Sequence, residues 1–210
     1  MSAHPQRRRR VALVTAARER GGAEVVMDVL ATRLPGHGVA PVLAAPEHSA
    51  NIERWQREGV AVCPLPVPAR LSDLRQGAKA IADIGRRLQE AGVDVVHTHG
   101  IAAQLYAGLA ARQQRLPVVY HVHDLFNPQW SADGALHRAA LRVPAARTIA
   151  ISASVAASLG ARVPASRLQI VLDGVTSDIV QPAPAAAGAG PLVVWCGRLQ
   201  QWKGPGHFIE

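Results

Sequence analysis

The chain has 210 residues, of which 49% are hydrophobic, 18% charged and 4% aromatic. This composition is typical of globular proteins and excludes wholesale disorder and collagen-like repeats. Lysine and arginine number 23 against 15 acidic residues, a formal net charge of +8. The length suits one domain with a sizeable core, or one domain and part of a second.

Four of the positive charges stand together at Arg7–Arg10, so residues 1–10 are predicted to form a basic arm. Such a run is usually solvated, and attraction to an anionic membrane is the second interpretation. No aromatic residue interleaves with the run and no nucleic-acid-binding motif follows it, which argues against a nucleic-acid partner.

The same arm, with the apolar stretch VALVTAA after it, imitates a signal peptide. The stretch is short and is followed at once by Arg18, Glu19 and Arg20, so it fits a first strand better. No apolar run approaches the roughly 20 residues that cross a bilayer. We therefore expect a cytoplasmic protein, with peripheral contact at the inner membrane surface as a further hypothesis. Cys63 and Cys196 stand in apolar runs and are predicted to be buried free thiols.

Short apolar runs alternate with helical patterns along the chain. This alternation, without strict period-two polarity, predicts an α/β fold: a Rossmann-like parallel sheet with helices on both faces, over residues 11–180. The strands are expected at 11–16, 39–44, 60–63, 93–97, 117–122, 147–151 and 167–172. The helices are expected at 22–34, 51–58, 102–112, 135–141 and, capped by Ser152 or Ser154, up to Gly160. Ser72 is the predicted cap of a further, long helix with Leu74, Ala78, Ile81 and Leu88 on one face.

Residues 181–191 read QPAPAAAGAGP, an uncharged stretch without periodicity that predicts a linker. Residues 192–210 then restart the pattern with one strand and a turn. About twenty residues cannot form a core. We therefore expect one complete domain and the incomplete beginning of a second.

Three groups of residues could carry chemistry. Gly21-Gly22 follows the first strand, where glycine lets a backbone approach an anion at a helix N-terminus, although a simple tight turn fits as well. Arg198 and Lys203 flank a strand-to-helix turn and suit a diphosphate, or are solvated cations.

The third group is a histidine cluster, DVVHTHG and YHVHD, at the ends of two strands predicted to be neighbours. Residues two apart on a strand face the same way, so His97, His99, His121 and His123 are expected to meet. They could bind a metal, or form a polar pocket for a hydroxylated substrate. Because Asp124 is the one obvious carboxylate nearby, we favour the pocket.

These pieces, in order, resemble family 4 glycosyltransferases of the GT-B fold. The resemblance spans GGAEVVMDVLATRLPGHGV, the two histidine-bearing strand ends, ISASVAASLGARVPASRLQIVLDGV and VVWCGRLQQWKG. It implies a retaining hexosyltransferase that moves a sugar from a nucleotide diphosphate-sugar to a sugar, lipid-linked or small-molecule acceptor, without a metal. Asp173 stands where the family usually has asparagine and can make the same turn.

The resemblance also implies roles for single residues. His123 and Asp124 would be catalytic, and Glu24 and His99 would bind the acceptor. Gly21, Gly22, Arg198 and Lys203 would bind the donor phosphates. The family's later glutamate pair would lie beyond Glu210, so this chain is expected to be the acceptor-binding half and inactive alone. The alternative is a non-catalytic module that binds a glycan, a lipid headgroup or a protein; a sugar-nucleotide epimerase would need more carboxylates near the cleft.

Overall fold

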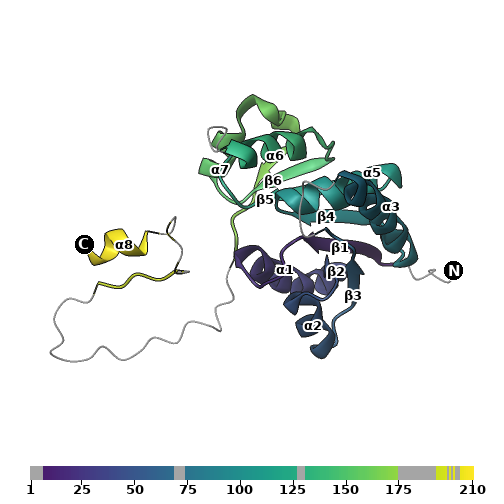
Figure 1. Cartoon of the computed structure of the whole chain (residues 1–210). Helices are drawn as coiled ribbons and strands as arrows, with labels where there is room; N and C mark the ends of the chain where they lie inside the picture. The colour runs from purple at the N-terminus through teal and green to yellow at the C-terminus, as the bar shows by residue number, and fades with distance from the viewer. Residues whose placement is uncertain are drawn as a thin grey trace. The chain divides into compact units, whose positions relative to one another are not determined.

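A computed structural model describes residues 7–68, 74–126, 131–174, 193–197, 199, 201 and 204–210. The chain divides into two compact units, residues 1–175 and 176–210. The first unit contains a seven-stranded sheet, all parallel, in the order β3-β2-β1-β4-β5-β6-β7 (Figure 1). The predicted Rossmann-like α/β fold is confirmed. Its strands are β1 (Arg9–Thr15), β2 (Val39–Pro46), β3 (Val62–Leu65), β4 (Val95–His99), β5 (Val118–Val122), β6 (Arg147–Ala150) and β7 (Leu168–Ile170).

Helices connect successive strands, as right-handed parallel crossovers require. Short 3₁₀ turns η1 (Leu34–His37), η3 (Gly160–Arg162) and η4 (Ala165–Arg167) complete the connections. The helices of this unit are α1 (Gly22–Arg33), α2 (Ala50–Arg57), α3 (Leu74–Glu90), α4 (Ile101–Ala103), the π-helical turn η2 (Gln104–Gly108), α5 (Leu109–Gln113), α6 (Ser131–Arg142) and α7 (Ala153–Leu159).

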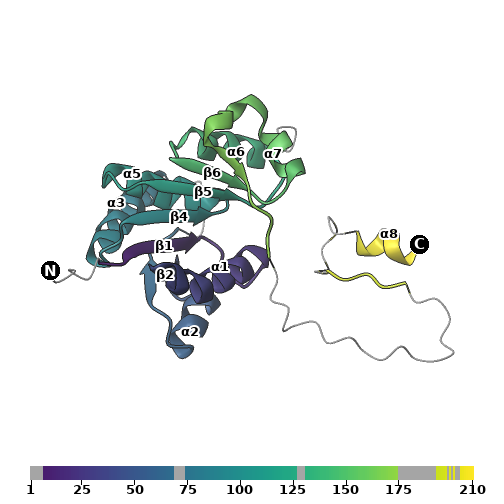
Figure 2. The same ribbon diagram turned by 180° about the vertical axis from the view of Figure 1, so that it is seen from behind.

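The two faces of the sheet carry different hydrophobic clusters because strand residues alternate in direction. On one face, Ala12 and Val14 of β1 pack in a buried cluster with Ile84 of α3. On the other face, Leu13 packs in a cluster with Met27 of α1 and Trp55 of α2, and both side chains are fully buried. Figures 1 and 2 show α1 and α2 on one side of the sheet and α3 and α5 on the other.

Strand boundaries differ from the sequence prediction at the places where pairing decides them. β1 begins two residues early, because Arg9 and Arg10 pair with the start of β2 and the Arg10 N–H donates to Asp94. β3 continues through Pro64, which an edge strand tolerates since one side needs no ladder bond. β4 runs two residues further than predicted, so His99 lies inside the strand.

The helix predicted at 102–112 forms as one continuous helical run but contains a π turn. Within it, the buried Gln104 accepts a hydrogen bond from Thr98 Oγ1 at 2.6 Å and donates one to the Val143 carbonyl at 3.1 Å. Such widened turns are commonly found near functional sites. The periodicity of the sequence gives no sign of this turn, because the buried amide that accompanies it bonds to residues of other elements.

The structure identifies the residue that caps α7. Ser152, and not Ser154, caps α7, since its Oγ accepts the Val155 N–H at 3.1 Å. Ser72, the predicted cap of α3, lies outside the described residues.

Cys63 is buried as expected, and burial raises the pKa of its thiol to about 11. The prediction that Cys196 is buried is wrong: it is exposed, because no described strand pairs with its segment.

The second unit is described in part. Residues 193–197, where a strand was predicted, pair with no other strand in the described part of the chain. A helix, α8 (Pro205–Ile209), begins directly after Gly204, where the sequence predicted one. The predicted linker at 181–191, together with Arg198 and Lys203, lies outside the described residues. In the described portion, no helix combines the length and apolarity that crossing a bilayer requires.

Candidate functional site

The carboxyl ends of β1, β4 and β5 bring the predicted site residues to one edge of the sheet. In a parallel sheet these ends meet at the same edge, where ligands of open α/β folds bind. The register pairs Thr15 with His99 and His99 with His121, so these three side chains share a face. It is the face that α1 and α2 cover further along, because Leu13, two residues before Thr15, packs there.

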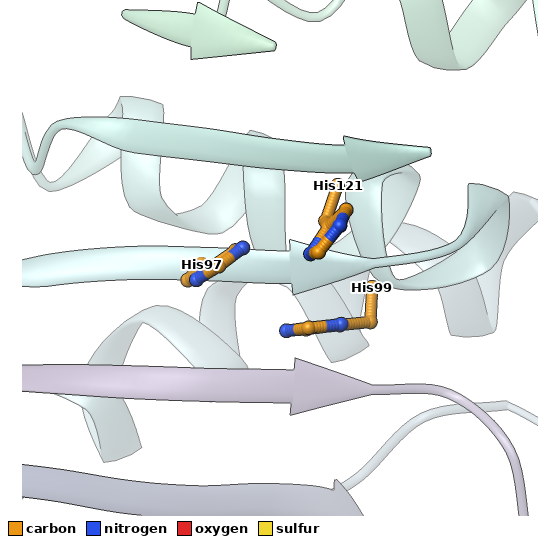
Figure 3. Close-up of side chains that lie close together, drawn as sticks. All are labelled: His97, His99 and His121. Atoms are coloured by element: carbon orange, nitrogen blue, oxygen red, sulfur yellow. The ribbon is translucent and has the colours of Figure 1, made fainter. Parts of the chain in front are cut away.

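The four histidines form one continuous cluster, as the sequence predicted. Figure 3 shows His97 and His99 of β4 and His121 of β5 gathered on one face of the sheet. The ring centroids of His97 and His99 lie 4.5 Å apart, and those of His121 and His123 lie 4.3 Å apart. The stacked and tilted rings place ring nitrogens of both strands close to one another.

His99 and His123 are joined directly. His99 Nδ1 and His123 Nε2 lie 3.0 Å apart, so one ring nitrogen donates a hydrogen bond and the other accepts it. On its far side, His123 Nδ1 lies 3.8 Å from Asp173 Oδ2, and His121 Nε2 lies 4.0 Å from Asp173 Oδ1. A carboxylate beside His123 favours the tautomer with a proton on Nδ1, and that tautomer accepts from His99.

Burial keeps these rings neutral. It lowers the pKa of His97 to about 4 and that of His121 to about 3, with further lowering from neighbouring histidines. Burial also lowers the pKa of His99 well below its ordinary value. The pKa of His123 is lowered by burial as well, although nearby carboxylates oppose this shift: Asp173, Asp124 and Glu24. Neutral imidazoles can donate and accept hydrogen bonds to a hydroxylated ligand.

Several nitrogens of the cluster are buried without a hydrogen-bond partner in the described structure: His97 Nε2, His99 Nε2 and both ring nitrogens of His121. Buried unpartnered polar atoms are rare and call for a ligand or another explanation. Two trios could hold a metal ion, because the ligand atoms of each lie within 4.8 Å of one another: His97, His99 and His121, and His121, His123 and Asp173. Imidazole and carboxylate donors suit Zn²⁺.

The loop between β1 and α1 is fixed by Glu24. This buried side chain accepts a hydrogen bond from Thr15 Oγ1 at 2.6 Å and another from the Gly21 N–H at 2.8 Å. The second bond is the glutamate half of a capping box at the helix N-terminus. Both carboxylate oxygens therefore have partners within the chain, and an acceptor-binding role for Glu24 stays a prediction.

Two glycine-containing turns surround the histidines. Gly21 is the N-cap of α1, and a Cβ on Gly22 would meet nothing within 4 Å, so the turn has open space on that side of Gly22. Gly100, directly after β4, has φ 84° and ψ 172°, a conformation that is essentially restricted to glycine. Its N–H donates to the His121 carbonyl at 3.2 Å and ties the ends of β4 and β5 together.

The structure gathers some of the predicted site residues and adds others. His99, His123, Glu24, Gly21 and Gly22 lie at the carboxyl edge, and Asp124 lies exposed at the end of β5. Arg198 and Lys203 are not among the described residues.

Sequence reasoning missed Asp173 as a site residue and treated it as a turn residue. Its position after the last predicted strand, at the edge where ligands bind, was the sequence feature that could have identified it as a site residue.

Comparison with known proteins agrees with the resemblance found in the sequence. The model of glycosyltransferase family 4 matches residues 20–178. No curated protein sequence gave a match. Among solved structures, Anabaena Alr3699/HepE in complex with UDP and glucose superposes with a TM-score of 0.68 at 17% identity, covering 83% of this chain and 47% of that one.

Two further structures have the same fold. Acinetobacter baumannii MurG matches with a TM-score of 0.59 at 18% identity over 83% of this chain and 48% of its own. A putative UDP-N-acetylglucosamine 2-epimerase from Listeria monocytogenes matches with a TM-score of 0.56 at 13% identity, over 76% and 43%. The chain thus spans about half the length of these structures, and the likeness shows the fold of a GT-B N-terminal domain without separating transferase from epimerase.

Proposed function

The chain belongs to glycosyltransferase family 4, and from this membership we propose that it is the acceptor-binding half of a retaining transferase. The enzyme moves a hexose from a nucleotide diphosphate-sugar to a sugar, lipid-linked or small-molecule acceptor. The observation that carries the proposal is the hydrogen-bonded pair of His99 and His123 at the carboxyl edge, beside the open turn at Gly22. Two of the three structures of similar fold support a nucleotide-sugar substrate: Anabaena Alr3699/HepE is in complex with UDP and glucose, and the Listeria protein is a putative UDP-N-acetylglucosamine 2-epimerase.

His123 is proposed to lie at the reacting sugar. Its lowered pKa leaves the ring neutral near pH 7, so it can hydrogen-bond a sugar hydroxyl without holding a charge in the site. His99 Nδ1 and Asp173 flank its two nitrogens and fix the orientation of the ring. Asp124, exposed at the end of the same strand, is proposed to act on the sugar beside it.

The donor phosphates are proposed to lie against the N-terminus of α1. The first N–H groups of a helix have no intrahelical partner, and the helix dipole favours an anion there. Gly21 and Gly22 form this turn: the Gly21 N–H is bonded to the Glu24 carboxylate, which holds the turn in place, and the Gly22 N–H is proposed to face the phosphates. Arg198 and Lys203 would neutralise the leaving diphosphate, since guanidinium and ammonium groups pair well with phosphoryl oxygens.

The proposed reaction needs no metal. The lowered pKa values leave the unpartnered nitrogens of the cluster neutral, so they could bind either an acceptor hydroxyl or a cation, and we propose that they bind the acceptor. The metal interpretation therefore has its own test: adding Zn²⁺ to protein stripped with a chelator should leave the unfolding midpoint within about 1 °C, whereas bound metal stabilises by mass action.

Two measurements on the 210-residue chain test the proposal. Donor turnover, followed as release of nucleotide diphosphate, should be absent when the chain is mixed with nucleotide-sugars and acceptors. Acceptor sugars should instead perturb the NMR signals of labelled histidine rings, and His123→Ala should weaken that binding about tenfold, the value of one lost hydrogen bond to a buried group. The exposed His37 offers the control substitution, His37→Ala. Turnover by this chain alone would show that the half-enzyme proposal is wrong.

The alternative, a non-catalytic module that binds a glycan, lipid headgroup or protein, predicts a different gene. Sequencing the DNA after the codon for Glu210 decides between them. A reading frame that continues with a second domain and a pair of glutamates supports the transferase. A stop codon at that point, together with acceptor binding that His123→Ala does not weaken, supports the module.

Membrane contact by the basic arm is a separate part of the proposal. Arg7 forms a salt bridge with Asp94 and the Arg10 N–H donates to the same carboxylate, whereas Arg8 and Arg9 form no salt bridge in the described structure. Each cation near an anionic surface contributes about 1 kcal/mol. Arg8→Gln with Arg9→Gln should reduce sedimentation with anionic vesicles at the inner-membrane charge density, and unchanged sedimentation would end this hypothesis.

A further inference from the structure

A cavity of about 530 Å³ lies at the amino edge of the sheet, where β5, β6 and β7 begin. This volume falls within the range of small-molecule sites. We call it the arginine cavity, because four arginines line it and none of its described lining residues is acidic: Arg112, Arg115, Arg147 and Arg167.

The four guanidinium groups have no carboxylate partner in the described part of the chain. Five arginines elsewhere in the described structure form salt bridges, as Arg54 does with Asp28 and Arg87 with Glu47. The Arg147 Nη1–H donates to the Ala146 carbonyl, which orders that side chain without neutralising it. Since arginine stays protonated in proteins, like charges gathered around one cavity raise the free energy of the unliganded state.

The positive region continues beyond this cavity. An adjoining cavity of about 220 Å³ shares Pro144, Ala145 and Arg167 with it and adds Arg142 and Arg162. Between residues 95 and 172 the acidic residues of the sequence are Asp124 and Asp133 alone, and Asp124 lies at the opposite edge, after β5. The amino edge of β5–β7 is therefore a strongly positive surface with a hollow in it.

The backbone at Arg115 is an independent observation. Its N–H donates to the Arg112 carbonyl and the Leu116 N–H donates to the Ala111 carbonyl, the pair of bonds that ends a helix in a Schellman motif. The motif needs a left-handed residue, and Arg115 takes it with φ 57°. Glycine is the usual residue there, and a side chain costs roughly 1 kcal/mol. A ligand-binding role for the Arg115 guanidinium would explain why arginine and not glycine stands at this position.

We propose that the arginine cavity binds a phosphoryl group, as a diphosphate or phosphomonoester. Guanidinium forks match phosphate oxygens in bidentate geometry, and several of them around one hollow suit a multiply charged anion. Apolar residues also line the cavity (Leu116, Pro117, Val118, Ala145), so part of its wall offers the arginines no internal acceptor. The phosphoryl group belongs either to a soluble compound or to a lipid headgroup.

This site is separate from the proposed transfer site. The arginines precede β5, β6 and β7, whereas the histidines end β4 and β5, so the five-residue β5 lies between them. At about 3.3 Å per residue that strand spans roughly 16 Å. A ligand in the arginine cavity therefore does not replace the donor phosphates proposed at Gly21 and Gly22.

The test compares variants of the 210-residue chain at low ionic strength. Pyrophosphate binding is measured by calorimetry, and sedimentation is measured with phosphatidylglycerol vesicles against phosphatidylcholine vesicles. Arg147→Gln with Arg167→Gln should weaken binding at least about tenfold, as expected for charge-assisted bonds. The matched control, Arg33→Gln with Arg57→Gln, removes two charges from the last turns of α1 and α2 and should change binding less than about twofold.

Arg115→Gly separates a ligand role from a structural one. It should raise the unfolding midpoint by about 2 °C because it relieves the left-handed backbone, while weakening binding. A loss of binding confined to pyrophosphate assigns a soluble phosphate, and a loss confined to anionic vesicles assigns a lipid headgroup. Arg147→Lys with Arg167→Lys, which keeps the charge, serves if the glutamine pair fails to fold. Equal binding by the cavity variants and the Arg33/Arg57 control would overturn the proposal.

Discussion

The two edges of the sheet differ in whether their polar groups are charged and in whether they have partners. At the carboxyl edge, imidazoles and a carboxylate are buried, neutralised or paired: His99 with His123, and Glu24 with Thr15 and Gly21. At the amino edge, arginines line a cavity and keep their full charge with no acidic partner among the described residues. Burying a charged group costs far more free energy than burying a neutral one. The carboxyl edge therefore consists of neutral rings and of oxygens that accept hydrogen bonds.

This difference predicts unequal tolerance to substitution. Groups at the carboxyl edge form buried hydrogen bonds. A substitution that removes one partner leaves the other as a buried polar atom without a hydrogen bond. Groups at the amino edge contribute charge more than packing. Substitutions at the first edge should therefore change stability, and those at the second should change ligand binding with little change in stability.

Glu24→Ala should show the largest effect. It removes the acceptor of two hydrogen bonds and leaves the Thr15 hydroxyl and the Gly21 N–H unpaired, at a cost of about 3 kcal/mol in unfolding free energy. Urea unfolding followed by circular dichroism measures this cost. Glu53→Ala, in the first turn of α2 and exposed, is the control and should change stability by less than about 0.5 kcal/mol. Equal costs in the two variants would remove the argument that Glu24 fixes the β1–α1 loop.

Gly100→Ala should follow. A methyl group there meets open space, so its cost is the backbone conformation alone, about 2 kcal/mol. Thermal unfolding should show a clear drop in the midpoint. Gly36→Ala also enters open space but at a position without positive φ, and it should be neutral or slightly stabilising. A neutral Gly100→Ala would mean that the end of β4 adapts freely.

Acid should weaken the carboxyl edge by a smaller amount. The folded-state pKa of His97 is about 4, below its ordinary 6.5, because burial and His123 disfavour the charged ring. The unfolded chain therefore binds a proton that the folded chain refuses, and stability falls as pH drops from 6.5 towards 4. Between pH 6.5 and 5.5 one such histidine costs on the order of 1 kcal/mol.

His97→Gln should reduce that acid sensitivity without abolishing it, since His99 and His121 remain and have lowered pKa values as well. Midpoints of thermal unfolding at pH 7.5 and 5.0 give the comparison. His37→Gln, at an exposed position in η1, serves as the control and should leave the pH dependence unchanged. An unchanged difference in His97→Gln would show that the cluster is not the source of acid sensitivity.

The smallest effect is expected at the amino edge. Arg147→Gln removes a side chain whose described hydrogen bond goes to the neighbouring carbonyl, so unfolding free energy should change by less than about 0.5 kcal/mol. Urea unfolding under the conditions used for Glu24→Ala makes the two edges directly comparable. A loss of more than about 2 kcal/mol in unfolding free energy would show that Arg147 stabilises the fold, and the two edges would then not differ in their tolerance to substitution.

Much of the candidate site was predictable because it depends on local pattern. The alternation of apolar runs and helical stretches fixes a parallel sheet, and parallel strands carry their last residues to one edge. His97, His99, His121 and His123 were therefore expected to meet, and they do. Asp173 was not recognised, because it follows β7, two strands away from β5 in the sheet order.

The arginine cavity was beyond sequence reasoning for a similar reason. Arg112 and Arg115 precede one strand, while Arg147 and Arg167 precede two others, and no local pattern joins them. The sequence by itself determined the sheet, its two edges and the residue types that each edge receives, since these follow from period and direction. The tertiary structure alone decided which groups have partners: both oxygens of Glu24 are bonded within the chain, and the arginines at the amino edge form no salt bridge with any described carboxylate. Partners come from elements distant in sequence, and only packing brings them within bonding distance.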